Sequence, residues 1–419
     1  MTESAAESKP PDLDDFRSRV RTWLTANVRR APDEEAARRH RYHPDRIAEG
    51  YAFHHRAWKA GFAGITCPVE YGGQGLSSQH QKIWDEEAAL FELPPHGSGA
   101  SLGVALPLLL AHGTEKLKLE HIPRILRAEV SWCQFLSESE AGSDLAGVRT
   151  TAALEGGDYV INGTKVWTSG AHFSQFALCL ARTDPDVPKH RGLTMFVVPV
   201  PAPGVTIRPV RNITGGSDFN EVFLDQVRVP AENIVGSVGG GWRIAQAMLG
   251  LERRMLGNGS ISGGALNAQP PVDLVELARR HGRAGEPVVR QLIADVWVHS
   301  LVAAETAARS HDDGFAGVPS VHIGSALKLL SEDVLTRQAR ASMSIAGPAG
   351  IAWPVDEPSG DRWGTAYLAA RAVSIGGGTT EIQKNIVGER LLGLPPEPRS
   401  DRDLPFSSVP KSAQPRPPR

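Results

Sequence analysis

The residues of this chain that could do chemistry gather in a few short segments, and one of them pairs a glutamate with a cation. Leu251-Glu252-Arg253 lies in residues 242–257, where apolar residues recur at helical spacing. A carboxylate on a helix can act as a general base when burial raises its pKa toward neutrality. The ordinary alternative is a surface glutamate paired with a neighbouring cation.

Three Gly-, Ser- and Thr-rich segments are the next candidates. Residues 132–147 read WCQFLSESEAGSDLAG, residues 162–171 read NGTKVWTSGA, and residues 376–395 read GGGTTEIQKNIVGERLLGLP. Backbone N–H groups in such stretches can bind a phosphate. The ordinary alternatives are a turn capped by Ser143 or its neighbour, and a core position for Trp167.

Two other motifs are weak. Residues 99–103 (GASLG) match the G-x-S-x-G nucleophile elbow, but turn-forming residues rather than a strand precede them, which argues against a hydrolase. His40, His43, His54 and His55 lie in polar, Arg-rich stretches without a nearby carboxylate motif, so we expect no metal site there.

The composition sets the class of protein but not its chemistry. The chain has 419 residues, 41% of them hydrophobic, which suffices for two to three domains. With 45 basic and 47 acidic residues the formal net charge is -2, so no basic field attracts nucleic acid. We find neither an apolar run long enough to span a membrane nor a secretory signal. Three widely spaced cysteines fit a reducing compartment, and we expect a cytoplasmic protein.

The period of the hydrophobic pattern changes twice along the chain. Residues 12–130 have helical spacing, residues 131–236 alternate with a period of two, and residues 237–395 return to helical spacing. We therefore expect an α+β protein with an N-terminal helical domain, a central antiparallel β-barrel or sandwich, and a C-terminal four-helix bundle. Residues 1–11 and 396–419 are expected to be disordered tails, because they are rich in proline and polar residues.

One hairpin is predicted inside the central domain. Asn162-Gly163 separates two short runs with strand character, residues 159–161 and 165–168. Asn-Gly is a strong hairpin signal, because both residues of such a turn need positive φ.

Together these segments resemble the acyl-CoA dehydrogenase family. The resemblance rests on the order and content of the three segments above, on NEVFLDQVRVPAENIVG at residues 220–236, and on CPVEYGGQGLS at residues 67–77. It implies an enzyme that binds FAD without a Rossmann fold and converts an acyl-CoA thioester to the 2-enoyl-CoA. A carboxylate would remove the α-proton, flavin N5 would accept the β-hydrogen as hydride, and an electron-transferring flavoprotein would accept the electrons.

The resemblance also implies which residues contact the cofactor. Those expected at the flavin ring are Phe135, Leu136, Ser137, Trp167, Thr168 and Ser169. Ser143 is expected at the pyrophosphate, and Arg280 at a pyrophosphate across a subunit interface. Thr379 and Gln383 are expected on the adenine side. A flat apolar face and a hydroxyl near N5, where negative charge develops, suit the chemistry of a flavin.

The base is where the chain departs from the commonest family pattern. Gly377 stands where many members carry the glutamate that removes the α-proton. A minority of members carry that glutamate in an L-E-R sequence after the β-domain, which Leu251-Glu252-Arg253 resembles. We therefore expect Glu252 to be the base and Arg253 to contact the substrate. The backbone N–H of Gly377 is expected to bind the thioester carbonyl in the manner of an oxyanion hole.

The stretches that meet neighbouring subunits in the family differ as well. Arg283 stands where the family has Phe, Ser344 stands where it has Gln, and residues 352–364 look longer than in short-chain members. We expect a homo- or hetero-oligomer, either a dimer or a tetramer. Two alternatives stay open: a non-catalytic or half-site partner subunit of a hetero-oligomer, and a flavin oxidase or monooxygenase on the same scaffold.

Overall fold

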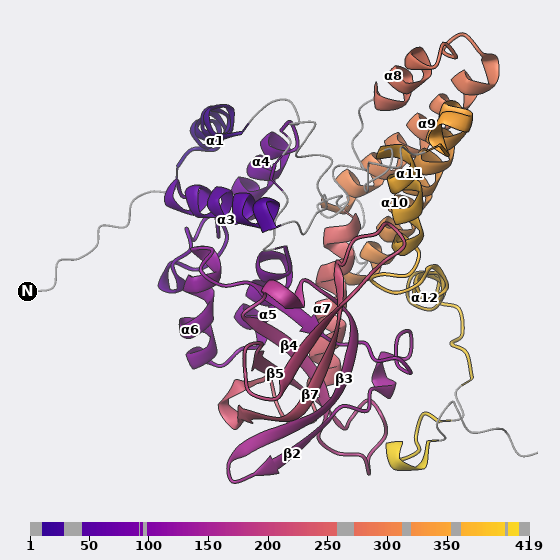
Figure 1. Cartoon of the computed structure of the whole chain (residues 1–419). Coiled ribbons are helices and arrows are strands. Elements are labelled where there is room, and N and C mark those ends of the chain that lie inside the picture. The colour runs from indigo at the N-terminus through magenta and orange to yellow at the C-terminus, as the bar shows by residue number, and fades with distance from the viewer. Residues whose placement is uncertain are drawn as a thin grey trace, which may run out of the picture. The chain divides into compact units, whose positions relative to one another are not determined.

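The computed structural model describes residues 11–28, 44–91, 93–94, 99–257, 272–311, 320–352, 362–398 and 401–409 (Figure 1). The chain divides into two compact units, which are Met1–Ser98 with Thr114–Ser131, and Gly99–Gly113 with Trp132–Arg419. His40, His43 and most of the 352–364 stretch lie outside the described residues.

The first unit is helical, as predicted. Its helices are α1 (Leu13–Asn27), α3 (Pro44–Lys59), α4 (Ser78–Ala88) and α6 (Glu115–Leu126). Asp12 caps α1, because its side chain accepts a hydrogen bond from the N–H of Asp14 at 2.9 Å. Phe16, Val20 and Leu24 recur every four residues on α1, and all three are buried in the core of this unit.

The second unit contains an eight-stranded sheet. Its strands are β1 (Trp132–Phe135), β2 (Thr151–Glu155), β3 (Asp158–Ser169), β4 (Phe176–Arg182), β5 (Leu193–Pro199), β6 (Val205–Val210), β7 (Phe219–Pro230) and β8 (Ile234–Val235). The order is β6-β7-β3-β2-β4-β5-β8, with β1 added beside β4. Most neighbours are antiparallel, whereas β1 and β2 pair with β4 in parallel. The predicted fold class, helical then β then helical, is confirmed.

The hairpin prediction is wrong in its turn. β3 runs through Asn162 and Gly163, where a bulge interrupts its pairing with β7. The turn lies instead at Gly156 and Gly157, whose φ angles of 62° and 95° suit a two-residue connection between β2 and β3. Glycine is required at position 163 for another reason, because a Cβ there would collide with Thr150.

The remaining helices of the second unit follow the sheet, apart from α5 (Leu106–His112). They are α7 (Gly241–Gly257), α8 (Val272–Arg280), α9 (Pro287–His311), α10 (Ser320–Ala346), α11 (Arg362–Val373) and α12 (Thr380–Ile386). α10 is the central helix, because it packs against α7, α8, α9, α11 and α12. α7 also packs on β4 and β5, so it connects the helices to the sheet. None of the described helices has the length and apolar character that crossing a bilayer requires.

A segment near the C-terminus docks on the sheet domain. Residues 401–409 fall in the stretch predicted to be a disordered tail, yet Phe406 is buried beneath the guanidinium of Arg182, 3.5 Å from its ring centroid. Lys189 forms an ion pair with Asp401 at 2.7 Å. A single aromatic anchor with charged flanks therefore orders this segment despite its polar composition.

Candidate active site

Glu252 lies on the buried face of α7. Ile244 and Met248 precede it at helical spacing and are fully buried, so all three side chains share one side of the helix. Glu252 is partly buried, and burial raises its pKa above the ordinary value near 4.5. The positive charges of Arg253 and Lys328 oppose that rise. This position does not fit a solvent-exposed ion pair, the ordinary alternative for a helix glutamate.

Lys328 on α10 binds the glycine-rich loop, and its positive charge also acts on Glu252. Its side chain is only 1% exposed, and Nζ donates a hydrogen bond to the carbonyl of Gly378 at 2.9 Å. Nζ also lies 3.4 Å from the carboxylate of Glu332, one turn further along α10. Thr380 donates from its hydroxyl to the same carboxylate. The loop and the N-terminus of α12 are thus attached to the middle of α10.

The glycine-rich loop has a backbone that favours glycine. Gly377 and Gly378 have φ angles of 67° and 92°, in the left-handed region where a side chain is strained. Gln383 donates from Nε2 to the carbonyl of Gly377 at 2.8 Å. Thr379 caps α12 by accepting from the N–H of Ile382. Within the described residues the N–H of Gly377 has no hydrogen-bond acceptor.

Several buried polar atoms on these helices also lack partners. Within the described part of the chain, no hydrogen bond is made by Arg253 Nε, Ser325 Oγ or Gln383 Oε1. An unsatisfied buried polar group costs about 1–3 kcal/mol, so proteins seldom keep several in one region without a ligand or water to satisfy them. Arg253 is 8% exposed, and burial lowers its pKa. These buried donors and acceptors could form hydrogen bonds with a polar ligand.

A second group of predicted residues comes together on the sheet. Phe135 ends β1 and is fully buried, and the chain continues into Leu136 and Ser137. Lys165 of β3, which has no exposed side-chain surface, donates from Nζ to the carbonyl of Leu136 at 3.0 Å. The N–H of Val166 donates to the carbonyl of Ser137 at 2.9 Å. The strand end after β1 and the last residues of β3 are therefore fixed to each other.

Lys165 has a buried acidic partner. Its Nζ lies 2.8 Å from the carboxylate of Glu138, which also accepts from the N–H groups of Arg149 and Thr150. Burial alone would raise the pKa of Glu138, but the charge of Lys165 and these hydrogen bonds hold it below its ordinary value. This buried pair organises the segment between β1 and β2.

Trp167 has an unusual conformation at the end of β3. It is a non-glycine residue with φ of 62°, and its side chain is 59% exposed, edge-on to Phe219 with ring centroids 6.0 Å apart. Thr168 is buried with no partner for its Oγ1 among the described residues, whereas Ser169 is exposed. Backbone strain and an exposed tryptophan both cost stability, and such costs are typical of functional sites. Trp167 is therefore not a core residue, which was the ordinary alternative for it.

Two predicted cofactor residues lie apart from these groups. Ser143 is exposed in the loop after β1, beside Asp144, whose carboxylate pairs with Lys189 at 2.9 Å. Arg280 is the exposed last residue of α8, and no hydrogen bond or ion pair in the described structure joins it to either group. Arg280 is expected to serve a neighbouring subunit.

The two interface positions that depart from the family pattern contact each other. Arg283 donates from its guanidinium to the carbonyls of Ser344 and Ile345, at 2.7 and 3.0 Å. It also pairs with Glu286. A cation at the C-terminal end of a helix satisfies carbonyls that have no partner within the helix.

Neither Lys165 nor Lys328 is predicted by the sequence motifs. A signal was present for Lys328, because Ser325 and Ser331 lie three residues before and after it, which marks a lysine on a small, buried helix face. Lys165 occupies an inward position in the alternating pattern of β3, and the mistaken turn at Asn162 concealed that pattern.

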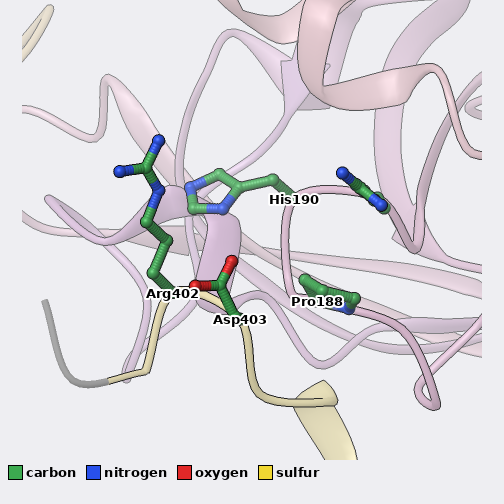
Figure 2. A pocket seen from close by; sticks show the side chains of 5 residues that line it. Pro188, His190, Arg402 and Asp403 are labelled. Carbon is green, nitrogen blue, oxygen red and sulfur yellow. The ribbon is translucent and has the colours of Figure 1, made fainter.

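The sequence also did not predict a pocket on the sheet domain. It is open, has a volume of about 440 Å³, and is lined by Pro188, His190, Arg191, Arg402 and Asp403. Figure 2 shows the imidazole of His190 facing the side chains of Arg402 and Asp403, which come from the docked C-terminal segment. Residues so far apart in the chain give no local sequence signal.

The weak motifs have structural explanations. Ser101 of the G-x-S-x-G match lies at the start of a helical turn and is fully buried, and its hydroxyl accepts from the N–H of Trp132 at 3.0 Å. It is therefore not on a strand-to-helix elbow. His54 is buried in α3, and His55 Nδ1 lies 2.9 Å from the carbonyl of Arg127. Among the described residues, no three His, Cys, Asp or Glu side chains are grouped to hold a metal ion.

Comparison with known sequences defines the class of protein. The profiles of the acyl-CoA dehydrogenase N-terminal, middle and C-terminal domains match residues 10–129, 133–227 and 239–392. The chain therefore belongs to the acyl-CoA dehydrogenase family and is an oxidoreductase. The predicted family is confirmed.

Similar proteins come from mycobacteria. Acyl-CoA dehydrogenase IpdE1 of Mycobacterium tuberculosis is 40% identical over 391 residues, which cover 92% of this chain and 99% of the relative. IpdE1 of Mycolicibacterium smegmatis is 37% identical over 401 residues, with the same coverage.

Solved structures share the fold. A steroid acyl-CoA dehydrogenase, Tcur3481-Tcur3483, has a TM-score of 0.76 and 26% identity, covering 93% of this chain and 99% of that one. The ChsE4-ChsE5 complex from Mycobacterium tuberculosis has a TM-score of 0.71 and 27% identity, covering 93% of this chain and 100% of that one.

Proposed function

We propose that this chain is an FAD-dependent dehydrogenase that converts an acyl-CoA thioester to the 2-enoyl-CoA, with Glu252 as the base. The observation that carries the proposal is the position of Glu252 on the buried face of α7, with its pKa raised by burial. Gly377, which stands where many family members carry the base, has no carboxylate to offer. Glu252 is then the carboxylate in place to accept the α-proton.

The surroundings of Glu252 suit a base that works near neutral pH. Burial raises its pKa, so the carboxylate accepts a proton more readily than an exposed one would. The positive charges of Arg253 and Lys328 limit the rise, because they favour the ionised form. Loss of the α-proton leaves negative charge on the thioester oxygen, and the N–H of Gly377 is the donor proposed to stabilise it.

The residues at the end of β3 and after β1 fit a flavin. Trp167 offers an exposed ring face, Ser169 an exposed hydroxyl, and Thr168 a buried Oγ1 without a partner in the described structure. Phe135, Leu136 and Ser137 would line the edge of the ring, Ser143 would bind the pyrophosphate, and Thr379 and Gln383 would serve the adenine side. The flavin, when bound, supplies the acceptor for the β-hydride.

We further propose a bulky, polycyclic acyl group as the substrate class. The similar structure Tcur3481-Tcur3483 is described as a steroid acyl-CoA dehydrogenase. A glycine at position 377 carries no side chain, whereas many family members carry a glutamate there. The electron acceptor in this proposal is an electron-transferring flavoprotein.

The test is anaerobic mixing of the flavin-loaded protein with straight-chain, branched and polycyclic acyl-CoAs while flavin absorbance is followed. Glu252→Gln is expected to retain FAD and to bleach at least about 100-fold more slowly, the low end of general-base effects. Glu276→Gln, an exposed glutamate on α8, is the matched control and should bleach at the wild-type rate. Unchanged bleaching of Glu252→Gln would refute the assignment of the base. Rapid reoxidation of the reduced flavin by air would favour the oxidase alternative.

A specific observation favours a second candidate, a half-site subunit of a hetero-oligomer. Two of the similar structures carry paired names, and one of them is described as a complex. Arg283, expected at the family's subunit contacts, donates to the backbone carbonyl of Ser344 within this chain. The FAD content per chain, measured for the protein purified alone, separates the candidates. One FAD per chain supports a self-sufficient enzyme, and a colourless protein supports the half-site subunit.

A further inference from the structure

We propose that Lys328 is a positioning residue for this reaction, which holds the glycine-rich loop in place and brings a positive charge to Glu252. The inference rests on the proposed function, because it requires Glu252 to be the base and the loop to bind the thioester carbonyl. No sequence motif indicates this role.

The contacts of Lys328 point to the loop. Its strongest hydrogen bond is to the carbonyl of Gly378 at 2.9 Å, whereas its only ion pair in the described structure, with Glu332, is longer at 3.4 Å. Thr380, two residues after Gly378, binds the other oxygen of Glu332. Lys328 therefore attaches the glycine-rich loop to α10, and Glu332 attaches the first residue of α12 to the same helix.

The loop needs such an attachment. Glycines lack side chains that could fix their conformation by packing, and they have the largest backbone freedom to lose. The carbonyl of Gly377 is held by Gln383 and that of Gly378 by Lys328. These two bonds restrain the loop, and an oxyanion-binding N–H must be fixed in advance to be effective.

The burial of Lys328 is costly. Removing an ammonium group from water costs several kcal/mol, which its partners must offset, and an apolar side chain of similar length would fill the space without that cost. Burial lowers the pKa of Lys328, while Glu332, Glu381 and Glu252 raise it. A role in the site explains why the position keeps a charge.

The charges that face Glu252 are few. Arg253 on α7 and Lys328 on α10 both favour its ionised form. On α10, the pKa of His322 is lowered by burial and then by the charges of Arg390, after α12, and Arg253. Removing the charge of Lys328 should therefore raise the pKa of Glu252, so that the base works only at higher pH.

The experiment compares the pH dependence of flavin bleaching in Lys328→Met, Lys328→Arg and wild type. For Lys328→Met we expect FAD retention, enoyl-CoA affinity within about threefold of wild type, and bleaching about 10–100-fold slower at pH 7, within the range of a general-base effect. The midpoint of its rate–pH profile should move up by about one unit, the usual size of a charge effect on pKa. Lys328→Arg keeps the charge and should keep the midpoint. Lys384→Met, an exposed lysine on α12, is the control.

A wild-type rate in folded Lys328→Met would overturn the inference, and so would a slower rate with an unchanged midpoint, since lost packing alone gives that result. If Lys328→Met does not fold, Thr380→Val serves, because it removes the hydroxyl that binds Glu332 and, at the longer distance of 3.5 Å, the carbonyl of Ser374. It should slow bleaching about threefold to tenfold, and an unchanged rate would overturn the inference. Normal bleaching of Glu252→Gln would refute the proposed function instead, so the two failures are distinguishable.

Discussion

The guanidinium of Arg283 donates a hydrogen bond to the carbonyl of Ser344, 2.7 Å away, at the C-terminal end of α10. These are the two positions at which the chain departs from the family's interface pattern. The contact is made to a backbone carbonyl, so the guanidinium of Arg283 caps the end of a helix that a neighbouring subunit is expected to meet.

Arg283→Ala should lower the melting temperature by roughly 2–4 °C, because the last carbonyls of α10 lose their donor. Differential scanning calorimetry measures the change. Glu286→Gln is the control, since it removes the ion pair of Arg283 and leaves its bonds to α10 intact, so its effect should be smaller. Equal melting temperatures for Arg283→Ala and wild type would show that solvent satisfies these carbonyls as well.

Trp167→Gly should separate stability from cofactor binding. The substitution relieves a positive φ at an exposed position, so the apoprotein should keep its stability or gain up to about 1 kcal/mol. FAD affinity should fall about tenfold or more, because the ring proposed to pack on the flavin is lost. Trp167→Phe restores an aromatic face and should recover most of the affinity. Urea unfolding and FAD titration test the two halves, and wild-type FAD affinity in Trp167→Gly would place the flavin elsewhere.

Lys165→Met should cost about 3–5 kcal/mol of unfolding free energy, because it leaves the carboxylate of Glu138 buried without its cation. Adding Glu138→Gln should recover part of the loss, since the amide oxygen can still accept from Arg149 and Thr150. Urea denaturation of the single and double variants gives the coupling energy. Lys59→Met, at an exposed site of α3, should change stability by less than about 0.5 kcal/mol. A similar loss in Lys165→Met alone and in the double variant would argue that packing dominates.

The raised pKa of Glu252 makes a prediction about pH and stability. A carboxyl group whose folded pKa lies above its unfolded value binds protons more tightly in the folded state. Its contribution to stability is therefore greatest at acid pH and is lost as the pH rises from about 4.5 through the folded pKa. The loss amounts to about 1.4 kcal/mol of unfolding free energy for each unit by which the folded pKa exceeds the unfolded one. Glu252→Gln does not titrate and avoids this loss. Urea unfolding of the apoproteins at pH 5 and pH 8 should show the larger advantage of the variant at pH 8.

The sequence predicts the family and the order of the domains better than it predicts the contacts around the candidate site. The L-E-R motif and the helical period before it suffice to place Glu252 on a buried helix face, because both signals are local. Lys328 and Gly378 are fifty residues apart, and their hydrogen bond depends on how α10 and α12 pack. The Asn162-Gly163 turn fails for a similar reason, since pairing with β7 and contact with Thr150 override a local preference. The docking of Phe406 likewise depends on Arg182, far away in the chain.

The proposed base lies on α7, whereas the proposed oxyanion-binding loop lies just before α12. Both α7 and α12 pack against α10. In family members with a glutamate at position 377, proton abstraction and binding of the thioester carbonyl depend on one short loop. A change in that loop can therefore impair both functions. In the arrangement proposed here, mutations can reshape the loop to admit wider or stiffer acyl groups while proton transfer continues on α7. With the two functions on separate elements, substitutions in the loop alone could broaden the range of acyl groups, in evolution or by protein engineering.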